Sequence, residues 1–378
     1  MNNLTVLHIA NDYSGSGVYK NLIEELDKLG ITQIVYTPVR EQSSIYKNKI
    51  DLKTSGSEII YSHILNKTTD RAFYPLKIKK ILRDIKQKVD ISKVKFIHAH
   101  TWYSDGGAAY LLSKQFNIPY IVAIRNTDLN LFQKRLVYLR PFGRRILLSA
   151  KHVITIAPTY KRRILDQSSL RVIKTELNEK IRIIPNGVDP YWIRNAVYEK
   201  KSNISASFNI LYIGKFNRGK NVVALQEAVK LLSKEKNKNI QLHIVGGGGN
   251  QTQKVLANVE RFPGLYKYYG EVYDKDELLK IYRSCDIFAM PSRHETFGLV
   301  YIEAMLQGLP VMYRKNEGID GYYTEKIGEA VTVGDVADIK NKLELLCEHY
   351  NHYELNIPLL AKNHDWRLIA GVYKDIYK

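Results

Sequence analysis

Short apolar segments alternate with helix-patterned segments along almost the whole chain of 378 residues. In the first half, the segments that resemble buried strands are residues 4–9, 34–37, 96–100, 120–124, 152–156 and 181–185. Helix-patterned stretches separate them. This alternation is typical of parallel sheets with helices on both faces, and it resumes at residue 209. The sequence therefore predicts an α/β protein with two doubly wound sheets.

Chain length also favours two domains, because a single hydrophobic core rarely extends beyond about 250–300 residues. Hydrophobic residue types make up 45% of the sequence, which supports globular folding. We predict a first domain over residues 1–195, a second over residues 196–361 and a final helical segment over residues 362–378. Residues 200–207 are polar, so we expect a linker there.

The cysteine content and the first residues bear on location. Cys285 and Cys347 are too few for a disulfide framework, which indicates a reducing compartment, most simply the cytoplasm. The N-terminus carries no basic segment ahead of an apolar one, so we expect no signal peptide. No apolar run approaches the ~18 residues that a transmembrane helix needs. The prediction is a cytoplasmic protein without a membrane-spanning segment.

Two carboxylates, Glu295 and Glu303, flank a glycine turn between an apolar strand and a helix-patterned run. We predict that this helix begins near Gly298. Its first N–H groups have no intrahelical partner and lie at the positive end of the helix dipole, so they suit a diphosphate. The backbone groups concerned belong to Phe297, Gly298, Leu299 and Val300. Taken alone, such a pair is more often an ordinary turn with solvated acids, and its neighbours decide between the two interpretations.

Two turns earlier in the chain favour the binding interpretation. Lys215 and Lys220 follow a strand that ends at Gly214, at a spacing that directs both side chains into one cleft. The next strand ends in four glycines, residues 246–249, which permit close approach of a ligand to the backbone. Each lysine on its own is an ordinary surface residue. The order of the turns along the chain makes the combination specific.

This ordered series resembles the retaining family 4 glycosyltransferases of the GT-B fold, and the likeness runs from about residue 4 to residue 366. The resemblance implies two Rossmann-like domains that face a cleft, with the final helical segment crossing back to the first domain. It also implies transfer of a sugar from a nucleotide diphosphate with retention of anomeric configuration.

The resemblance assigns roles to residues at matching positions. Lys215 and Lys220 would hold the donor diphosphate, and with Glu295 they form the catalytic set. Glu295 would contact the donor sugar and Glu303 the ribose. The remaining donor-binding positions are Gly15, Gly17, Gly214, Gly246, Gly247, Val272, Phe297, Gly298, Leu299 and Val300. The family usually has Arg at the position of Lys215 and Gly at the position of Asn221, and Lys lacks the two-pronged grip of Arg.

The pair Gly15 and Gly17 follows the first predicted strand and invites comparison with the dinucleotide-binding fingerprint. We reject the fingerprint because Lys20 stands where its third glycine belongs. By the resemblance, this loop faces the acceptor and the donor phosphates, and a simple tight turn is the equal alternative. The resemblance also places residues 270–272 beside the nucleotide base.

His98 and His100 lie at the end of a predicted strand and point to one face. A shared metal would need a third ligand, and none stands at ligand spacing beside them, so we expect no metal site. The family often has a His in the loop after the next strand, where this chain has other polar residues. We assign the acceptor or sugar loop to His100, Arg125, Asn126 and Asp128.

The net charge is the remaining informative feature. The chain has 57 Lys and Arg against 38 Asp and Glu, a formal charge of +19, which favours an anionic partner. Residues 71–95 carry nine Lys or Arg and two Asp on a helical pattern, and residues 134–151 mix basic and aromatic residues. We expect these segments to dock on an anionic membrane; the alternative is a solvated basic face. No nucleic-acid-binding motif is present.

The residues and the family resemblance together predict a metal-independent hexosyltransferase without a cofactor, and the resemblance implies that it retains the anomeric configuration. It would use a UDP-sugar or GDP-sugar and act on a glycan or polyprenyl-linked acceptor in surface polysaccharide biosynthesis, at the inner face of the cell membrane. No carboxylate base is identifiable, so we expect a donor phosphate oxygen to accept the acceptor proton. The alternative from another class is a non-catalytic GT-B subunit that binds a glycan or sugar nucleotide. A GT-B epimerase or phosphorylase matches the ordered motifs less well.

Overall fold

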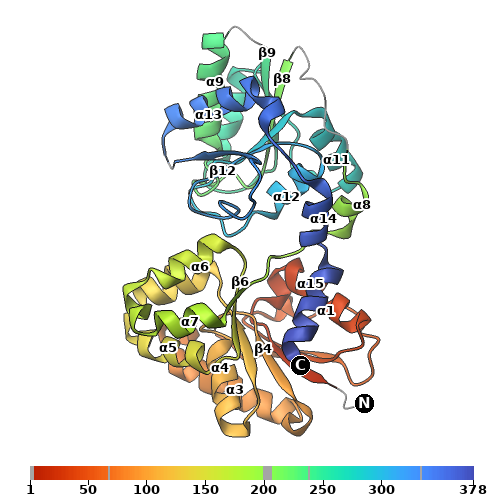
Figure 1. Ribbon diagram of the computed structural model, residues 1–378, viewed down its shortest axis with the longest axis vertical. Helices are drawn as coiled ribbons and strands as arrows, with labels where there is room; N and C mark the ends of the chain where they lie inside the picture. Colours follow the sequence, from red (N-terminus) through yellow and green to blue (C-terminus); the bar gives the residue numbers. More distant parts are fainter. Residues whose placement is uncertain (1–3, 67–68, 199–206, 237–238, 333) are drawn as a thin grey trace. The chain divides into compact units, whose positions relative to one another are not determined.

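The computed structural model describes residues 4–66, 69–198, 207–236, 239–332 and 334–378. The chain forms two compact units, which Figure 1 shows. The first contains residues 1–156, 160–187 and 366–378, and the second contains residues 157–159 and 188–365. The chain thus changes unit after Gly187, earlier than the boundary expected at residue 195. The linker expected at residues 200–207 lies almost wholly outside the described residues.

The first unit is built on a sheet of seven parallel strands in the order β3-β2-β1-β4-β5-β6-β7. The strands are β1 Thr5–Ile9, β2 Thr32–Val39, β3 Glu58–His63, β4 Phe96–Ala99, β5 Tyr120–Ala123, β6 His152–Thr155 and β7 Ile181–Ile183. Six of them coincide with the predicted strands. The sequence analysis missed β3, an edge strand whose apolar run is only three residues long, 59–61, and is half-buried between the polar ends Glu58 and His63.

Helices cover both faces of this sheet, as the alternation of patterns predicted. They are α1 Gly17–Lys28, α2 Thr69–Ala72, α3 Tyr74–Lys88, α4 Gly106–Phe116, α5 Arg140–Ser149, α6 Pro158–Leu165 and α7 Lys174–Lys180. A segment with π-helical hydrogen bonding, Asp128–Gln133, follows β5.

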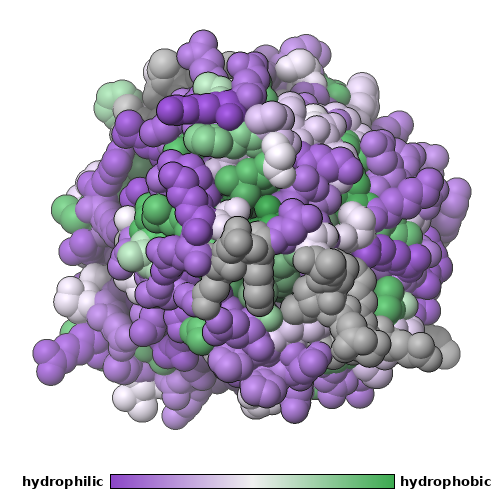
Figure 2. Space-filling model, turned by 90° about the horizontal axis from the view of Figure 1, so that it is seen from above, coloured by the Kyte–Doolittle hydropathy of each residue, from purple (hydrophilic) through white to green (hydrophobic). Residues whose placement is uncertain are grey.

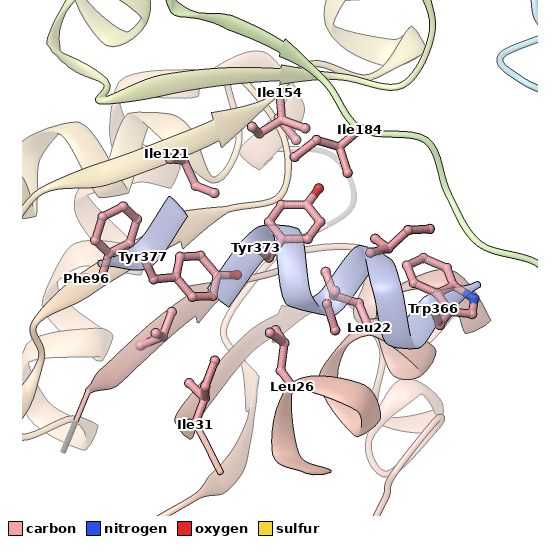
Figure 3. Packing of buried hydrophobic residues seen from close by; sticks show 14 residues of the cluster. Leu22, Leu26, Ile31, Phe96, Ile121, Ile154, Ile184, Trp366, Tyr373 and Tyr377 are labelled. Atoms are coloured by element: carbon pink, nitrogen blue, oxygen red, sulfur yellow. The ribbon is translucent and has the colours of Figure 1, made fainter. Parts of the chain in front are cut away.

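The last helix of the chain, α15 (Trp366–Tyr377), belongs to the first unit and lies beside α1. Figure 3 shows its aromatic side chains inserted between α1 and the sheet. Trp366, Tyr373 and Tyr377 are almost fully buried in one apolar cluster. Their partners in the cluster include Leu22, Leu26, Phe96, Ile121 and Ile154. Packing of α15 therefore completes the core of the first unit.

The second unit contains six parallel strands in the order β10-β9-β8-β11-β12-β13. The strands are β8 Ser207–Ile213, β9 Asn239–Val245, β10 Tyr266–Tyr268, β11 Ile287–Ala289, β12 Val311–Arg314 and β13 Gly328–Val331. The helices are α8 Pro190–Arg194, α9 Val222–Lys236, α10 Thr252–Arg261, α11 Lys275–Ser284, α12 Leu299–Leu306, α13 Val336–Glu348 and α14 Ile357–Asn363. The prediction of two doubly wound α/β sheets is confirmed.

The surface is mainly hydrophilic in the view of Figure 2, with hydrophobic residues in small, separate areas. Within the part of the chain that the structure describes, no helix combines the length and apolar character needed to cross a membrane.

Candidate active site

The strand order of the second sheet reverses direction between β8 and β11, which pair in parallel. In open sheets of this kind, ligands bind beyond the carboxyl ends of the strands at such a switch point. The loop after β8 contains Lys215 and Lys220, and the loop after β11 contains Glu295. The topology therefore brings together residues that are about 75 positions apart in the sequence.

Lys220 and Glu295 form an ion pair, with 2.7 Å between Lys220 Nζ and Glu295 Oε2. The lysine side chain is 29% exposed and the glutamate side chain 10%. Backbone contacts fix both loops: Asn217 Oδ1 accepts the N–H of Lys220 at 3.0 Å, and Gly219 O accepts the N–H of Arg293 at 2.7 Å. The pair is thus held in one place before any ligand binds. Lys215, by contrast, is exposed.

Glu317 supports this pair and was not singled out in the sequence. Its Oε2 accepts the backbone N–H of Glu295 at 2.7 Å, and its Oε1 lies 3.3 Å from His294 Nδ1. Glu317 follows β12, the strand beside β11 in the sheet. The available signal was an acid near a glycine, Gly318, shortly after a strand that ends at the same edge of the sheet.

A helix begins where it was predicted, with α12 starting at Leu299 directly after Gly298. Gly298 has a φ of +81°, and a Cβ atom there would lie 2.5 Å from the ring of Tyr301. Glycine is therefore required for this turn. Phe297 is buried, whereas Leu299 and Val300 are half-buried. The start of α12 offers N–H groups that lack intrahelical partners, next to the Lys220–Glu295 pair in the chain.

Glu303 lies about one turn into α12 and is half-buried. Tyr282 Oη donates a hydrogen bond to its Oε2 at 3.2 Å. Burial raises the pKa of Glu303 to about 7, despite the opposing effect of the Tyr282 hydrogen bond. A carboxyl group with this pKa changes charge near neutral pH, which is frequent at functional sites.

The glycines after β9 allow two loops of the second unit to approach each other closely, while their predicted contact with a ligand stays a prediction. Gly246 and Gly249 adopt φ values of +126° and +97°. A Cβ atom at Gly246 would lie 2.2 Å from Gly214 O, and one at Gly249 would lie 2.6 Å from Phe216 O. The close approach that these glycines permit is thus to the loop after β8. A Cβ at Gly247 would lie 2.9 Å from the Glu271 side chain.

Other donor-side positions have clear local roles. The N–H of Gly246 donates to Gly270 O at 2.7 Å, which ties the loop after β9 to the loop that contains the half-buried Val272. Asn221 has a φ of +61°, a left-handed conformation that Asn tolerates better than most residues. This conformation explains how Asn stands where the family resemblance expects glycine.

In the first unit, the loop residues assigned to the acceptor or sugar partly support the backbone. Asp128 is buried and accepts N–H groups from Trp102, Tyr103 and Arg125 at 3.0, 3.1 and 2.9 Å. Arg125 Nε donates to His100 O at 3.2 Å. These bonds show that Asp128 orders the loop, while its assignment to the acceptor or sugar loop stays a prediction.

The remaining predicted positions of the first unit are Asn126, Gly15 and Gly17, and the two glycines have open surroundings. Asn126 Oδ1 accepts from Asn130 at 2.5 Å. Gly15 ends the short turn Tyr13–Gly15 and Gly17 begins α1, and a Cβ at either glycine would meet no atom within 4 Å.

The expectation that His98 and His100 lack a third neighbour of ligand type was wrong. His8 lies on β1, which pairs with β4, and the three side chains are buried together. His8 Nδ1 lies 3.1 Å from His100 Nε2, and His98 Nδ1 lies 2.7 Å from Tyr377 Oη. The rings of His98 and His100 stack with centroids 3.9 Å apart at 18°, so their in-plane lone pairs run nearly parallel. This arrangement favours packing under α15.

Comparisons with known proteins agree with this architecture. The model of glycosyl transferases group 1 matches residues 196–356, and the model of glycosyltransferase family 4 matches residues 16–192. The fold and the matched models define a GT-B glycosyltransferase. The chain belongs to glycosyltransferases of the family 4 type, as the sequence analysis predicted.

Individual relatives are distant but span the chain. A D-inositol 3-phosphate glycosyltransferase from Corynebacterium jeikeium is 25% identical, and the alignment covers 97% of this chain and 92% of that protein. Sucrose-phosphate synthase from Thermosynechococcus elongatus superposes with a TM-score of 0.71 at 19% identity, over 99% and 98% of the two chains. HepE from Anabaena, in complex with UDP and glucose, gives 0.67 at 15% identity, over 98% of each chain. The likeness to these structures concerns the fold.

Proposed function

We propose that this glycosyltransferase transfers a hexose from a nucleotide diphosphate to a hydroxyl group with retention of anomeric configuration. The observation that carries the proposal is the Lys220–Glu295 pair at the switch point of the second sheet. A cation there, with the free N–H groups that start α12, forms a positive site for a diphosphate. Glu295, the ion-pair partner of Lys220, would accept hydrogen bonds from hydroxyl groups of the donor sugar.

The proposed chemistry uses few protein groups. The bond between the anomeric carbon and the diphosphate oxygen breaks while the acceptor oxygen bonds to that carbon on the same face. The acceptor proton passes to an oxygen of the leaving diphosphate. Lys220, Lys215 and the α12 amides stabilise the negative charge that grows on the diphosphate. Glu303 would accept hydrogen bonds from the hydroxyl groups of the ribose. The loop that contains Val272 would contact the base of a UDP-sugar or GDP-sugar.

Metal independence belongs to the same proposal, because the two lysines and the α12 amides supply the positive field that a bound cation gives in other enzymes. We expect EDTA to leave the rate of donor cleavage within a small factor. Loss of activity with EDTA, restored by magnesium or manganese, would show that this part of the proposal is wrong.

The acceptor is assigned to the first unit. We propose a glycan or lipid-linked acceptor in surface polysaccharide biosynthesis, with the enzyme at the inner face of the cell membrane. The high positive charge supports an anionic acceptor or surface. The Corynebacterium relative is named a D-inositol 3-phosphate glycosyltransferase, and a phosphate ester of this kind is anionic.

The decisive test is a panel of UDP- and GDP-sugars, screened first by thermal shift and then by release of the nucleoside diphosphate. We expect one donor to stabilise the protein and to be turned over, with turnover lost in Lys220→Ala. Lys234→Ala, an exposed lysine on α9, is the matched control and should retain the wild-type rate. Donor binding without turnover under all conditions would favour a non-catalytic binding subunit instead.

A further inference from the structure

The first unit contains a cavity of about 400 Å³ at the switch point of its own sheet. The strand order reverses direction between β1 and β4, and the cavity is lined by residues that follow these strands, among them Asn11, Asp12, Thr101 and Ser104. Two cationic side chains also line it, Lys77 from α3 and Arg40 after β2. The topology thus gives the first unit a ligand site of its own.

Lys77 is the unusual residue of this cavity, because it is only 3% exposed. Buried lysines are rare unless their charge is paired. Its Nζ donates to Ser104 Oγ at 2.8 Å, and no ion pair of Lys77 occurs among the described residues. Since an ammonium group has three N–H donors, two remain for a ligand.

Arg40 brings a second cation to the same cavity. Its Nε is buried and has no hydrogen-bond partner in the described part of the chain. Burial lowers the pKa of Lys77, and the charge of Arg40 lowers it further, against the opposing charges of Asp105, Asp12 and Asp70. Two converging cations with unused donors are the arrangement that an oxyanion would satisfy.

The carboxylates around the cavity are largely engaged elsewhere. Asp70 lies 3.3 Å from Lys80 Nζ and accepts the N–H of Asn66. Asp105 is buried and accepts from Asn11 N at 3.1 Å and from Thr101 Oγ1 at 2.9 Å. Burial and the nearby Asp12 raise the pKa of Asp105, which reduces its negative charge. Asp12 itself is exposed and can accept hydrogen bonds from hydroxyl groups of a ligand.

We propose that the Lys77–Arg40 cavity binds a phosphate ester on the acceptor, with Asp12 and Thr101 contacting the hydroxyl groups beside it. The inference rests on the proposed transferase function and names the acceptor class. The phosphate can belong to a soluble sugar phosphate or to a lipid-linked one. Leu131 and Leu136 also line the cavity and supply an apolar wall suited to the lipid form.

Binding to the full chain without donor tests the proposal directly. Isothermal titration calorimetry would use glucose 6-phosphate, a short-chain prenyl phosphate and unphosphorylated glucose. We expect both phosphates to bind more tightly than glucose, and the tighter of the two identifies the source of the phosphate. Lys77→Met should weaken phosphate binding by about ten- to a hundredfold, the range for losing a hydrogen bond to a charged group.

Matched variants separate this site from general charge and from the donor site. Arg40→Gln should also weaken phosphate binding, whereas Lys79→Gln, an exposed lysine on the same helix, should not. UDP affinity, measured in parallel, should stay at the wild-type value in all three variants. Equal binding of glucose and the phosphates, or equal losses in Lys77→Met and Lys79→Gln, would overturn the proposal. Failure of the transferase function would show separately, as absent nucleotide binding and turnover.

Discussion

Lys220 and Lys215 differ in how firmly the structure holds them. Lys220 is fixed by Glu295, whereas Lys215 is exposed. Because preorganised charge stabilises a transition state better than mobile charge, we expect Lys220→Ala to lower the transfer rate by about ten- to a thousandfold. Lys215→Ala should have a smaller effect, and the double variant should lose less than the product of the two. Initial rates at saturating donor would measure all three. An unchanged rate in a folded Lys220→Ala variant would remove this lysine from the site.

The roles assigned to Glu303 and Glu295 can be separated by the pH dependence of nucleotide binding. Burial raises the pKa of Glu303 to about 7, and its charged form is the better acceptor for ribose hydroxyls. Affinity for the free nucleoside diphosphate should therefore rise between pH 6 and pH 8. Glu303→Gln should remove most of this pH dependence, whereas Glu295→Gln should keep it and lose transfer. Calorimetry at several pH values gives both slopes, and identical slopes in wild type and Glu303→Gln would rule out the assigned role.

Residues of the candidate site could be proposed from the sequence where one loop holds the whole local pattern. Glu295 and Lys220 were both proposed from local turns, and the structure pairs them. Glu317, His8 and Lys77 were not identified, because each acquires its neighbours through strand pairing or helix packing between distant segments. Lys77 in particular stands in a basic helical run that predicts a solvated face, yet the structure buries it.

At the scale of elements, helix α15 packs against the buried histidines His8, His98 and His100, and this packing makes the stability of the fold depend on pH. Tyr377 contacts His98, and Tyr373 stacks on it with ring centroids 5.1 Å apart. Burial lowers the pKa of His8 to about 3 and holds the pKa values of His98 and His100 well below 6.5. The unfolded chain therefore binds protons more readily than the folded one. The stability that these histidines provide is present above about pH 6.5 and is lost as the pH falls below it.

Thermal unfolding between pH 7 and pH 5 tests this element. We expect Tm to fall with pH, at a cost of up to about 1.4 kcal/mol per pH unit for each histidine that must stay neutral. His98→Phe keeps a ring in the stack but cannot titrate, so its Tm should depend less on pH than that of the wild type. His352→Phe, at an exposed position, should keep the wild-type dependence. Equal slopes in His98→Phe and wild type would show that the cluster does not control acid stability.

Elements were more predictable than their boundaries and edges. Central strands of parallel sheets are buried on both faces and appear as apolar runs, so β1, β4, β5 and β6 were identified. The edge strand β3 is half-exposed, and its apolar run is only three residues long, 59–61. The glycines at the end of β9 were recognised as special, but their contact with the loop after β8 required the strand order.

At the scale of the whole molecule, the net charge of +19 belongs almost entirely to the first unit, whose sequence ranges contain 34 Lys or Arg against 16 Asp or Glu. The exposed face of α3 presents Lys79 and Arg83, which have no ion pair among the described residues, and Lys86, which lies 3.4 Å from Gln115 Oε1. Lys80 lies 3.3 Å from Asp70. The side chain of Arg71, part of the basic run in the sequence, is outside the described structure. Large apolar side chains of the same unit are also exposed: Phe73 by 58%, Leu76 by 60%, Val137 by 51% and Tyr138 by 58%. Basic and apolar groups together are typical of a membrane-docking surface.

Docking on an anionic membrane is therefore the prediction for the whole molecule. Each basic residue near such a surface contributes about 1 kcal/mol, so the cations of α3 acting together should give binding that high salt weakens. Neutralising Lys79, Lys80, Arg83 and Lys86 to Gln should release the protein from phosphatidylserine vesicles in a cosedimentation assay, with nucleotide affinity unchanged. The matched control neutralises exposed lysines of the second unit: Lys254, Lys267, Lys280 and Lys362. If this control releases the protein equally, total charge rather than α3 determines binding, and if the wild type stays in solution at low salt, the acceptor is soluble.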